Sequence, residues 1–334
     1  MEQRRLGGTG LRVSRLALGT MTWGRDTDEH EARDQLTAFV EVGGTLVDTA
    51  AGYGSGASEE VLGGLLRTVV DRDDVVLATK AGISRRTGRR VVDLSRRGLL
   101  DQLDGSLRRL GTDHVDLWQV HTWSYATPLE ETLGALDAAV ASGRTRYVGV
   151  SNLTGWQTAR AVTWQQAWPG RAPVVSTQVE YSLLQRGVER EVLPAAAALR
   201  LGVLAWSPLG RGVLTGKYRT GTPADSRAAS AHFAGFVEPY LAPAADRVVT
   251  AVCTAAEGLG LAPLEVALAW VRDRPGVSSA IVGARTAAQL RGSLPAVDVE
   301  LPAEIRSALD EVSEPALGYP ERSEDQRPED GEPR

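Results

Sequence analysis

Short apolar runs alternate along the chain with longer segments in which apolar residues recur at helical spacing. The runs are bounded by glycine, proline or polar residues, as buried strands of a parallel sheet are. Strands are predicted at residues 15–18, 45–47, 75–79, 115–120, 145–150, 174–178, 203–206 and 280–282. Helices are predicted at residues 28–42, 59–70, 96–110, 129–142, 154–168, 188–200, 246–258, 263–273, 286–294 and 302–312.

This alternation predicts one α/β domain with a parallel barrel, the (β/α)8 or TIM barrel. No break in composition divides the alternating segments into two units. A doubly wound open sheet is the alternative. It is disfavoured because no dinucleotide-binding glycine fingerprint follows any of the strands.

Four segments do not fit the alternation. Residues 4–13 predict a hairpin around a glycine turn. The arginine-rich residues 81–93 predict a solvated loop rather than a phosphate-binding loop. Residues 208–243 are rich in Gly, Pro and Ala, and a structureless segment of that length is typically functional or mobile. Residues 314–334 are acidic and Pro-rich and predict a disordered tail, which leaves residues 1–313 as the domain.

Reactive side chains follow three of the predicted strands. Asp48, Lys80 and His121 each stand at the end of a strand, and Tyr53 lies in the loop beyond Asp48. In a parallel α/β barrel the strand ends meet at one face, which is where catalytic residues are placed. We therefore expect these four side chains to lie together.

The four residues form a set that can protonate an oxygen. A tyrosine hydroxyl has a pKa of about 10, and a nearby ammonium such as that of Lys80 should lower it. Asp48 would pair with Lys80 and keep it charged, and a neutral His121 could orient a substrate carbonyl. Protonation of an oxygen while another group attacks the carbon is what carbonyl reduction requires.

Beyond these residues, the sequence resembles the aldo-keto reductase family, whose catalytic Asp, Tyr, Lys and His occur in this chain order. The resemblance runs from about Arg5 to about Val312, which is nearly the whole chain. The matching stretches are L-V-D-T-A-A-G-Y-G, L-A-T-K, L-W-Q-V-H, V-G-V-S-N, Q-V-E-Y-S-L-L, W-S-P-L-G-R-G-V-L-T-G-K-Y and V-G-A-R-T.

The resemblance implies reversible, NADPH-dependent reduction of an aldehyde or ketone to the alcohol, with Tyr53 as the proton donor. It also implies that the hairpin at residues 4–13 closes the bottom of the barrel and that residues 302–312 form an extra C-terminal helix. The long segment after residue 208 is typical of a branch that includes bacterial reductases and potassium-channel β subunits.

The resemblance further implies which residues hold the cofactor. Trp206 would stack on the nicotinamide, Arg227 would reach the adenosine half, and Arg285 would contact a 2′-phosphate, which favours NADP(H) over NAD(H). The expected contacts are Thr20, Met21, Asp48, Ser151, Asn152, Gln178, Trp206, Ser207, Pro208, Leu209, Gly212, Lys217, Arg227, Gly283, Arg285 and Gln289.

The sequence departs from the family at the adenine end and does not define the substrate. Gly292 and Ser293 stand where relatives carry a polar pair that contacts the adenine. Trp23 and Trp123 are expected to form an aromatic substrate wall with Tyr53 and His121, and ordinary packing of the loops is the alternative.

The amino-acid composition and net charge exclude several classes of function. The 334 residues include 43% apolar and 24% charged residues with a net charge of −5, so nucleic acid is not an expected partner. One cysteine fits a reducing, cytoplasmic location, and no apolar run is long enough for a membrane span. The histidines show no metal-ligand spacing. The expected partner is a small carbonyl compound, and the sequence does not define the oligomeric state.

A non-enzymatic alternative remains at this stage. A nucleotide-binding partner protein of the potassium-channel β-subunit type would have the same fold and little or no turnover. The complete set of Asp48, Tyr53, Lys80 and His121 favours the enzyme. Turnover of a carbonyl compound would separate the two possibilities.

Overall fold

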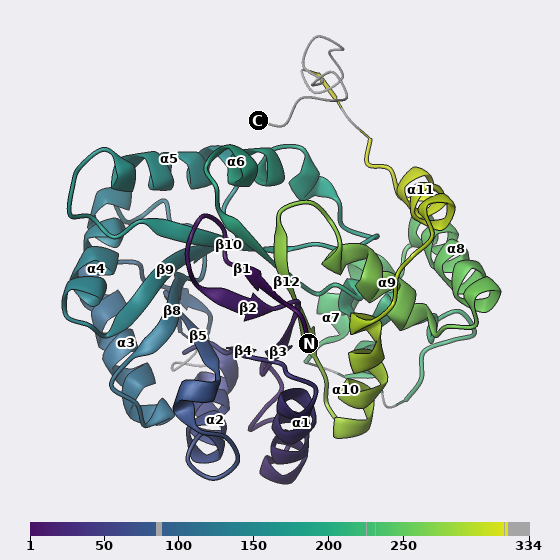
Figure 1. Cartoon of the computed structure of the whole chain (residues 1–334), viewed down its shortest axis with the longest axis horizontal. Helices are drawn as coiled ribbons and strands as arrows, with labels where there is room; N and C mark the ends of the chain where they lie inside the picture. The colour runs from purple at the N-terminus through teal and green to yellow at the C-terminus, as the bar shows by residue number, and fades with distance from the viewer. Residues whose placement is uncertain (85–88, 225, 231, 317, 320–334) are drawn as a thin grey trace.

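Eight parallel strands close into a barrel in the computed structural model, which describes residues 1–84, 89–224, 226–230, 232–316, 318 and 319 (Figure 1). In barrel order the strands are β3 (Leu16–Gly19), β4 (Leu46–Asp48), β5 (Val76–Ala81), β8 (Val115–Val120), β9 (Thr145–Ser151), β10 (Val174–Glu180), β11 (Gly202–Trp206) and β12 (Val277–Gly283). Strand β12 pairs with β3 and closes the barrel. The predicted (β/α)8 fold is confirmed.

Helices surround the barrel, most of them against the outer face of its strands. They are α1 (Glu29–Glu41), α2 (Ala57–Leu65), α3 (Arg96–Leu110), α4 (Leu129–Ala141), α5 (Gly155–Gln166), α6 (Val192–Ala198), α8 (Pro243–Leu259), α9 (Pro263–Arg272), α10 (Ala287–Ser293) and α11 (Ala303–Val312). Their ends follow local signals. For example, α1 begins after Asp28, whose side chain accepts a hydrogen bond from the Glu31 amide, and α3 ends at left-handed Gly111.

Helix α6 is shorter than predicted. It begins at Val192 rather than near Val188, because Pro194 is tolerated only in the first turn of a helix. Helix α2 also ends early, at Leu65, just after the paired Gly63 and Gly64. Glycine in a helix interior costs about 1 kcal/mol relative to alanine, so the pair weakens continuation.

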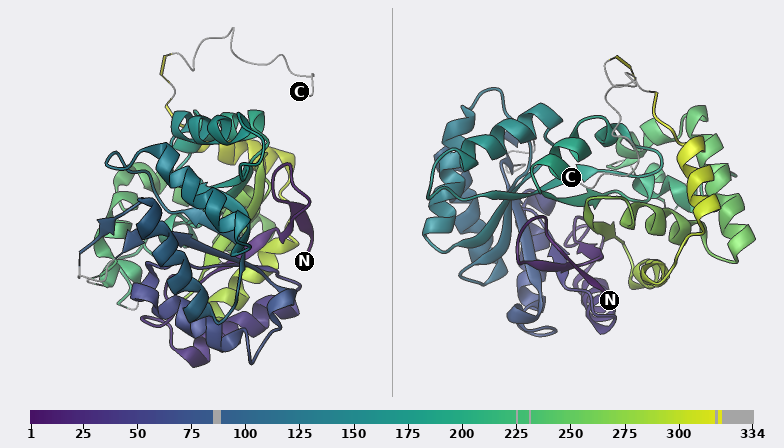
Figure 2. Two further views of the ribbon diagram at one scale, coloured as in Figure 1. Left: turned by 90° about the vertical axis from the view of Figure 1, so that its left-hand side faces the viewer. Right: turned by 45° about the horizontal axis from the view of Figure 1, so that its top comes forward.

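An N-terminal hairpin covers one end of the barrel. Strands β1 (Gln3–Arg5) and β2 (Arg12–Ser14) pair antiparallel and lie across the barrel axis (Figures 1 and 2). Leu6 and Val13 pack inside with the inward-facing residues of the barrel strands. Gly7 has φ +58°, and a Cβ there would lie 2.5 Å from the Gly202 nitrogen, so only glycine fits. The hairpin therefore closes this end, as expected.

Two predicted loops contain regular structure. Within residues 81–93, β6 (Ile83–Ser84) pairs antiparallel with β7 (Val91–Val92), so the described part of this segment contains a short two-stranded sheet. Residues 208–243 are not structureless, because short helical turns and α7 (Ala234–Val237) occur there. Buried Phe233, Val237 and Tyr240 anchor that segment, whose Gly and Pro content hid its apolar pattern.

The C-terminal prediction falls largely outside the described residues. Helix α11 ends at Val312, and residues 317 and 320–334 of the predicted disordered tail are not among those described.

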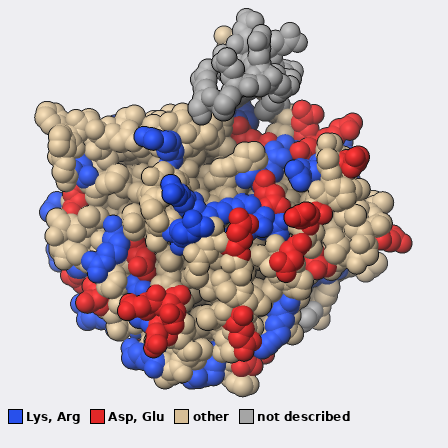
Figure 3. Space-filling model, viewed as in Figure 1, with Lys and Arg blue, Asp and Glu red and all other residues tan. Residues whose placement is uncertain are grey.

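On the face that carries the hairpin, acidic and basic side chains are interspersed (Figure 3). In the described part of the chain no single helix meets the length and hydropathy needed to cross a bilayer. The bent pair α8 and α9 does so only when taken together.

Candidate active site

A buried ion pair lies at the carboxyl ends of β4 and β5. The Lys80 Nζ donates to Asp48 Oδ2 over 2.6 Å and to the Thr49 carbonyl oxygen over 2.8 Å. Gln178 Nε2 donates to the other carboxylate oxygen of Asp48 over 2.9 Å. Burial acts against the charge of Lys80, but the carboxylate of Asp48 holds the pKa of Lys80 above its usual value. Lys80 is therefore a fixed cation beneath the barrel mouth.

Tyr53 lies above this pair, in the helical turn Tyr53–Gly56 that follows β4. The Lys80 Nζ is 5.0 Å from the centroid of the Tyr53 ring. Burial raises the pKa of Tyr53 above 10, and the opposing pull of Lys80 is offset in part by the charge of Asp48. Lys80 does lower this pKa, as expected, but desolvation outweighs it, so the net shift of the Tyr53 pKa is upward. The phenol keeps its proton at neutral pH, which is the state a proton donor needs.

His121 follows β8 and faces Tyr53. The two ring centroids are 5.9 Å apart, with the planes at 80°. Burial, followed by the charges of Lys80 and Arg90, lowers the pKa of His121 to about 3. The imidazole is therefore neutral at physiological pH, as the sequence predicted. Its Nδ1 is buried and has no hydrogen-bond partner among the described residues.

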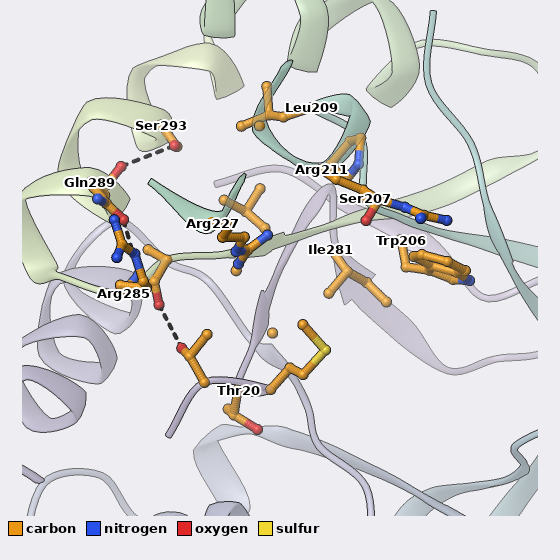
Figure 4. Close-up of a pocket in the computed structure, with 18 of the residues that line it drawn as sticks. Thr20, Trp206, Ser207, Leu209, Arg211, Arg227, Ile281, Arg285, Gln289 and Ser293 are labelled. Atoms are coloured by element: carbon orange, nitrogen blue, oxygen red, sulfur yellow. Dashed lines mark hydrogen bonds between the residues drawn. The ribbon is translucent and has the colours of Figure 1, made fainter. Parts of the chain in front are cut away.

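A cavity of about 570 Å³ extends from these residues across the barrel mouth. Every residue expected to contact the cofactor lines it, as do Tyr53, His121, Gly292 and Ser293. Figure 4 shows Trp206 and Arg285 at opposite ends of this cavity, with Arg227 between them. An elongated ligand with one end at Trp206 and the other at Arg285 would pass Arg227. The residues present thus fit a dinucleotide.

The side chains at the Trp206 end bind one another. Trp206 Nε1 donates to Asn152 Oδ1 over 3.0 Å, and Asn152 Nδ2 donates to the His121 carbonyl oxygen over 3.0 Å. Ser151 Oγ donates to the Gln178 carbonyl oxygen over 2.9 Å. These bonds fix the orientation of each group. Gln178 keeps its Oε1 and one amide proton without a partner among the described residues, and these could bind a carboxamide.

Two positively charged groups meet at the opposite end. Burial and then the nearby guanidinium of Arg285 lower the pKa of Arg227. An anion between Arg227 and Arg285 would relieve this repulsion, and phosphate suits arginine especially well. Ser293 Oγ donates to the Gln289 carbonyl oxygen over 3.0 Å, so its hydroxyl is turned to the helix backbone (Figure 4). Gly292 leaves open space, since a Cβ there would meet no atom within 4 Å.

Sequence reasoning missed two residues that fasten residues 208–243 to the barrel. The Arg211 guanidinium makes two bonds to the Glu180 carboxylate, of 2.8 and 2.6 Å, and also donates to the Phe236 carbonyl oxygen. It lies 3.8 Å from the centroid of the Phe236 ring. That ring is stacked at 15° to Trp206, 6.4 Å away. Arg211 stood within a recognised motif, whereas nothing in the sequence marked Phe236.

A second cavity, of about 780 Å³, adjoins the first. It shares four residues with the first cavity: Met21, Tyr53, His121 and Phe236. The rest of its lining is Gly24, Arg25, Gly52, Gly54, Ser55, Ile83, Arg90, His232 and Phe233. Tyr53 and His121 thus stand where the two cavities join.

In the described part of the chain, no group of His, Cys, Asp and Glu could hold a metal ion.

The expected tryptophan wall is not part of either cavity. Trp23 is fully buried and donates its indole N–H to Gln35 Oε1 over 3.1 Å, so it belongs to the packing between β3 and α1. Trp123 packs edge-on against Trp156, with centroids 5.5 Å apart, and lines neither cavity. Both tryptophans therefore take part in ordinary packing, which was the alternative to the aromatic substrate wall. Apart from Tyr53 and the two histidines, the aromatic residues on the second cavity wall are Phe233 and Phe236, from the segment predicted to be structureless.

The sequence model of the aldo/keto reductase family matches residues 15–314. The chain is 37% identical to the uncharacterized oxidoreductase YrpG of Bacillus subtilis (strain 168), over 93% of this chain and 96% of that protein. It is 35% identical to a probable voltage-gated potassium channel subunit beta of Oryza sativa subsp. japonica, over 98% and 100%. It is 33% identical to the L-glyceraldehyde 3-phosphate reductase of Escherichia coli (strain K12), over 89% and 88%.

Proposed function

The chain belongs to the aldo/keto reductase family, and from this premise we propose that it is an oxidoreductase that reduces an aldehyde or ketone to the alcohol, reversibly, with NADPH. The observation that carries the proposal is the place of Tyr53 and His121 at the junction of the two cavities, directly above the Asp48–Lys80 pair. One cavity suits a dinucleotide and the other a small substrate.

The protein's part in the reaction is positioning and proton transfer. When bound, the reduced nicotinamide supplies a hydride to the carbonyl carbon. Neutral His121 hydrogen-bonds the carbonyl oxygen and holds it beside the Tyr53 hydroxyl. Tyr53 gives its proton to that oxygen as negative charge develops, and Lys80 stabilises the phenolate that remains. Asp48 holds Lys80 in place. Water then returns a proton to Tyr53.

We assign the cofactor preference to the arginine pair at the far end of the first cavity. Arg227 and Arg285 supply two positive charges where an adenosine 2′-phosphate would lie, and NAD(H) has no group to meet them. The single cysteine supports a reducing cytoplasmic location for such an enzyme.

The first test is direct. Purified protein is mixed with NADPH or NADH and a panel of aldehydes and ketones, and absorbance of the reduced nicotinamide is followed. We expect NADPH oxidation with at least one activated aldehyde, faster than NADH oxidation. Failure of every carbonyl compound with both nucleotides would overturn the proposal.

A second function has one observation in its favour. The rice relative is named as a probable potassium channel subunit and matches along its whole length. Tight NADPH binding without turnover of any carbonyl compound would favour a nucleotide-binding partner protein of that type. The complete catalytic set places the reductase first.

A further inference from the structure

Among the residues that the structure describes, the charged residues lining the second cavity are all basic. Arg25 and Arg90 line it together with His232, and no described lining residue is Asp or Glu. A cavity wall of one sign creates a potential that favours ligands of the opposite sign. The remaining lining is glycine, serine and apolar or aromatic residues beside Tyr53 and His121.

Arg25 forms a fixed part of this wall. Its Nε and Nη2 lie 2.8 and 2.7 Å from Asp26 Oδ2, and its Nη1 lies 2.7 Å from His232 Nε2. The guanidinium carbon lies 4.6 Å from the centroid of the Phe233 ring. Because a guanidinium only donates, His232 Nε2 is the acceptor of this hydrogen bond. Asp26 therefore balances part of the Arg25 charge, and the position of Arg25 is set.

Arg90 is the less compensated cation. It is exposed, immediately precedes β7, and makes no ion pair with any carboxylate of the described residues. It is also near enough to His121 for its charge to disfavour protonation of the imidazole. A substrate whose carbonyl oxygen is held by His121 therefore has Arg90 within electrostatic reach of its other end.

We propose that the substrate is an anionic carbonyl compound, with a carboxylate or phosphate group that binds Arg90 on the wall of the second cavity. The inference rests on the proposed reductase function and names the substrate class of the same site. Arg90 pairs with the anion, Arg25 adds to the local positive potential, and Phe233 and Phe236 contact the carbon chain. A neutral analogue fits the cavity but leaves Arg90 paired with water alone.

The test compares matched substrates by the ratio of their kcat/KM values. Carboxylate preference is measured with 4-carboxybenzaldehyde against benzaldehyde, and phosphate preference with glycolaldehyde phosphate against glycolaldehyde. We expect at least one anionic-to-neutral ratio of about tenfold or more at low salt, falling as salt screens the pair. The substrate pair that shows the preference identifies the anionic group as a carboxylate or a phosphate.

Arg90→Gln should bring that ratio down by about tenfold, whereas Arg89→Gln, an equal charge change at the exposed neighbour that does not line the cavity, should leave it unchanged. A ratio near one in the unmodified protein, or a ratio that survives Arg90→Gln, overturns the inference. Turnover of the neutral aldehydes in that case leaves the reductase proposal standing. Absence of turnover with all four compounds overturns the inference, whereas the reductase proposal is decided by the wider carbonyl panel with NADPH and NADH.

Discussion

Trp206 and Asn152 are joined by a hydrogen bond of 3.0 Å from the indole Nε1 to the amide Oδ1. Asn152 has φ +60° and also donates to the His121 carbonyl oxygen. One residue thus positions both the ring that would stack on the nicotinamide and the backbone of the residue that would orient the carbonyl. Asparagine suits this place because it tolerates the left-handed conformation better than most residues do.

Asn152→Ala should weaken NADPH binding about tenfold, because Trp206 loses its acceptor and the backbone becomes strained. The dissociation constant is measured by fluorescence titration. Asn152→Asp is the matched control, since it keeps the acceptor for Trp206 and replaces the Nδ2 donor to the His121 carbonyl oxygen and Ser151 Oγ by a carboxylate oxygen. The control should therefore bind NADPH more tightly than the alanine variant. Equal binding by the two variants would mean that the Trp206 bond is unimportant.

Tyr53→Phe should lower kcat by about 10²–10⁴-fold, the range for a lost general acid. NADPH affinity should change by less than about twofold, because the phenol acts mainly in the transition state. Steady-state kinetics and a binding titration together check this. Retained activity in the phenylalanine variant would remove Tyr53 from the mechanism.

Lys80→Met should destabilise the fold by about 3–5 kcal/mol, because it leaves the buried Asp48 carboxylate without its cation. The free energy of unfolding from urea titration measures the effect. The double variant Asp48→Asn, Lys80→Met removes both charges and should recover part of the loss. If the double variant is less stable than Lys80→Met alone, the cost lies in packing rather than in the isolated charge.

His121 gives stability a defined pH dependence. Its pKa falls from 6.5 in the unfolded chain to about 3 in the folded protein, so the unfolded state binds more protons between these values. The contribution is fully present above pH 6.5 and is lost as pH falls towards 3. His121→Asn should therefore make the urea midpoint depend less steeply on pH in this window. An unchanged slope would show that His121 titrates normally in the folded protein.

Arg285→Ala should raise the dissociation constant of NADPH about tenfold and that of NADH by less than about twofold. The reason is that only NADPH carries a 2′-phosphate for the guanidinium to meet. Arg291→Ala provides the control, because Arg291 lies close by in α10, is exposed and does not line the cavity. An equal loss for both nucleotides in Arg285→Ala would assign Arg285 a different contact.

The periodicity of the sequence was enough to predict the barrel and the meeting of Asp48, Lys80 and His121. Parallel strand ends converge by geometry, so a polar residue that ends an apolar run can be placed without knowing its neighbours. The cofactor contacts came from motif resemblance, and the structure puts all of them on one cavity wall.

Other features could not be read from local pattern. Arg211 and Phe236 act through contacts between residues 208–243 and the barrel, and a Gly/Pro-rich pattern does not report such contacts. Trp23 was misplaced because its polar partner, Gln35, comes from α1 and removes the indole from the mouth. The direction of the Tyr53 pKa was missed because desolvation depends on burial, which three-dimensional packing decides.

Phe236 belongs to the walls of both cavities, and Arg211 secures it to Glu180. Movement of this ring away from Trp206 would open both compartments at once. Product escape and nucleotide exchange would then be coupled to one gate rather than to two independent exits. Catalytic cycles limited by that gate would slow as solvent viscosity rises and would show only a small kinetic isotope effect from deuterated cofactor.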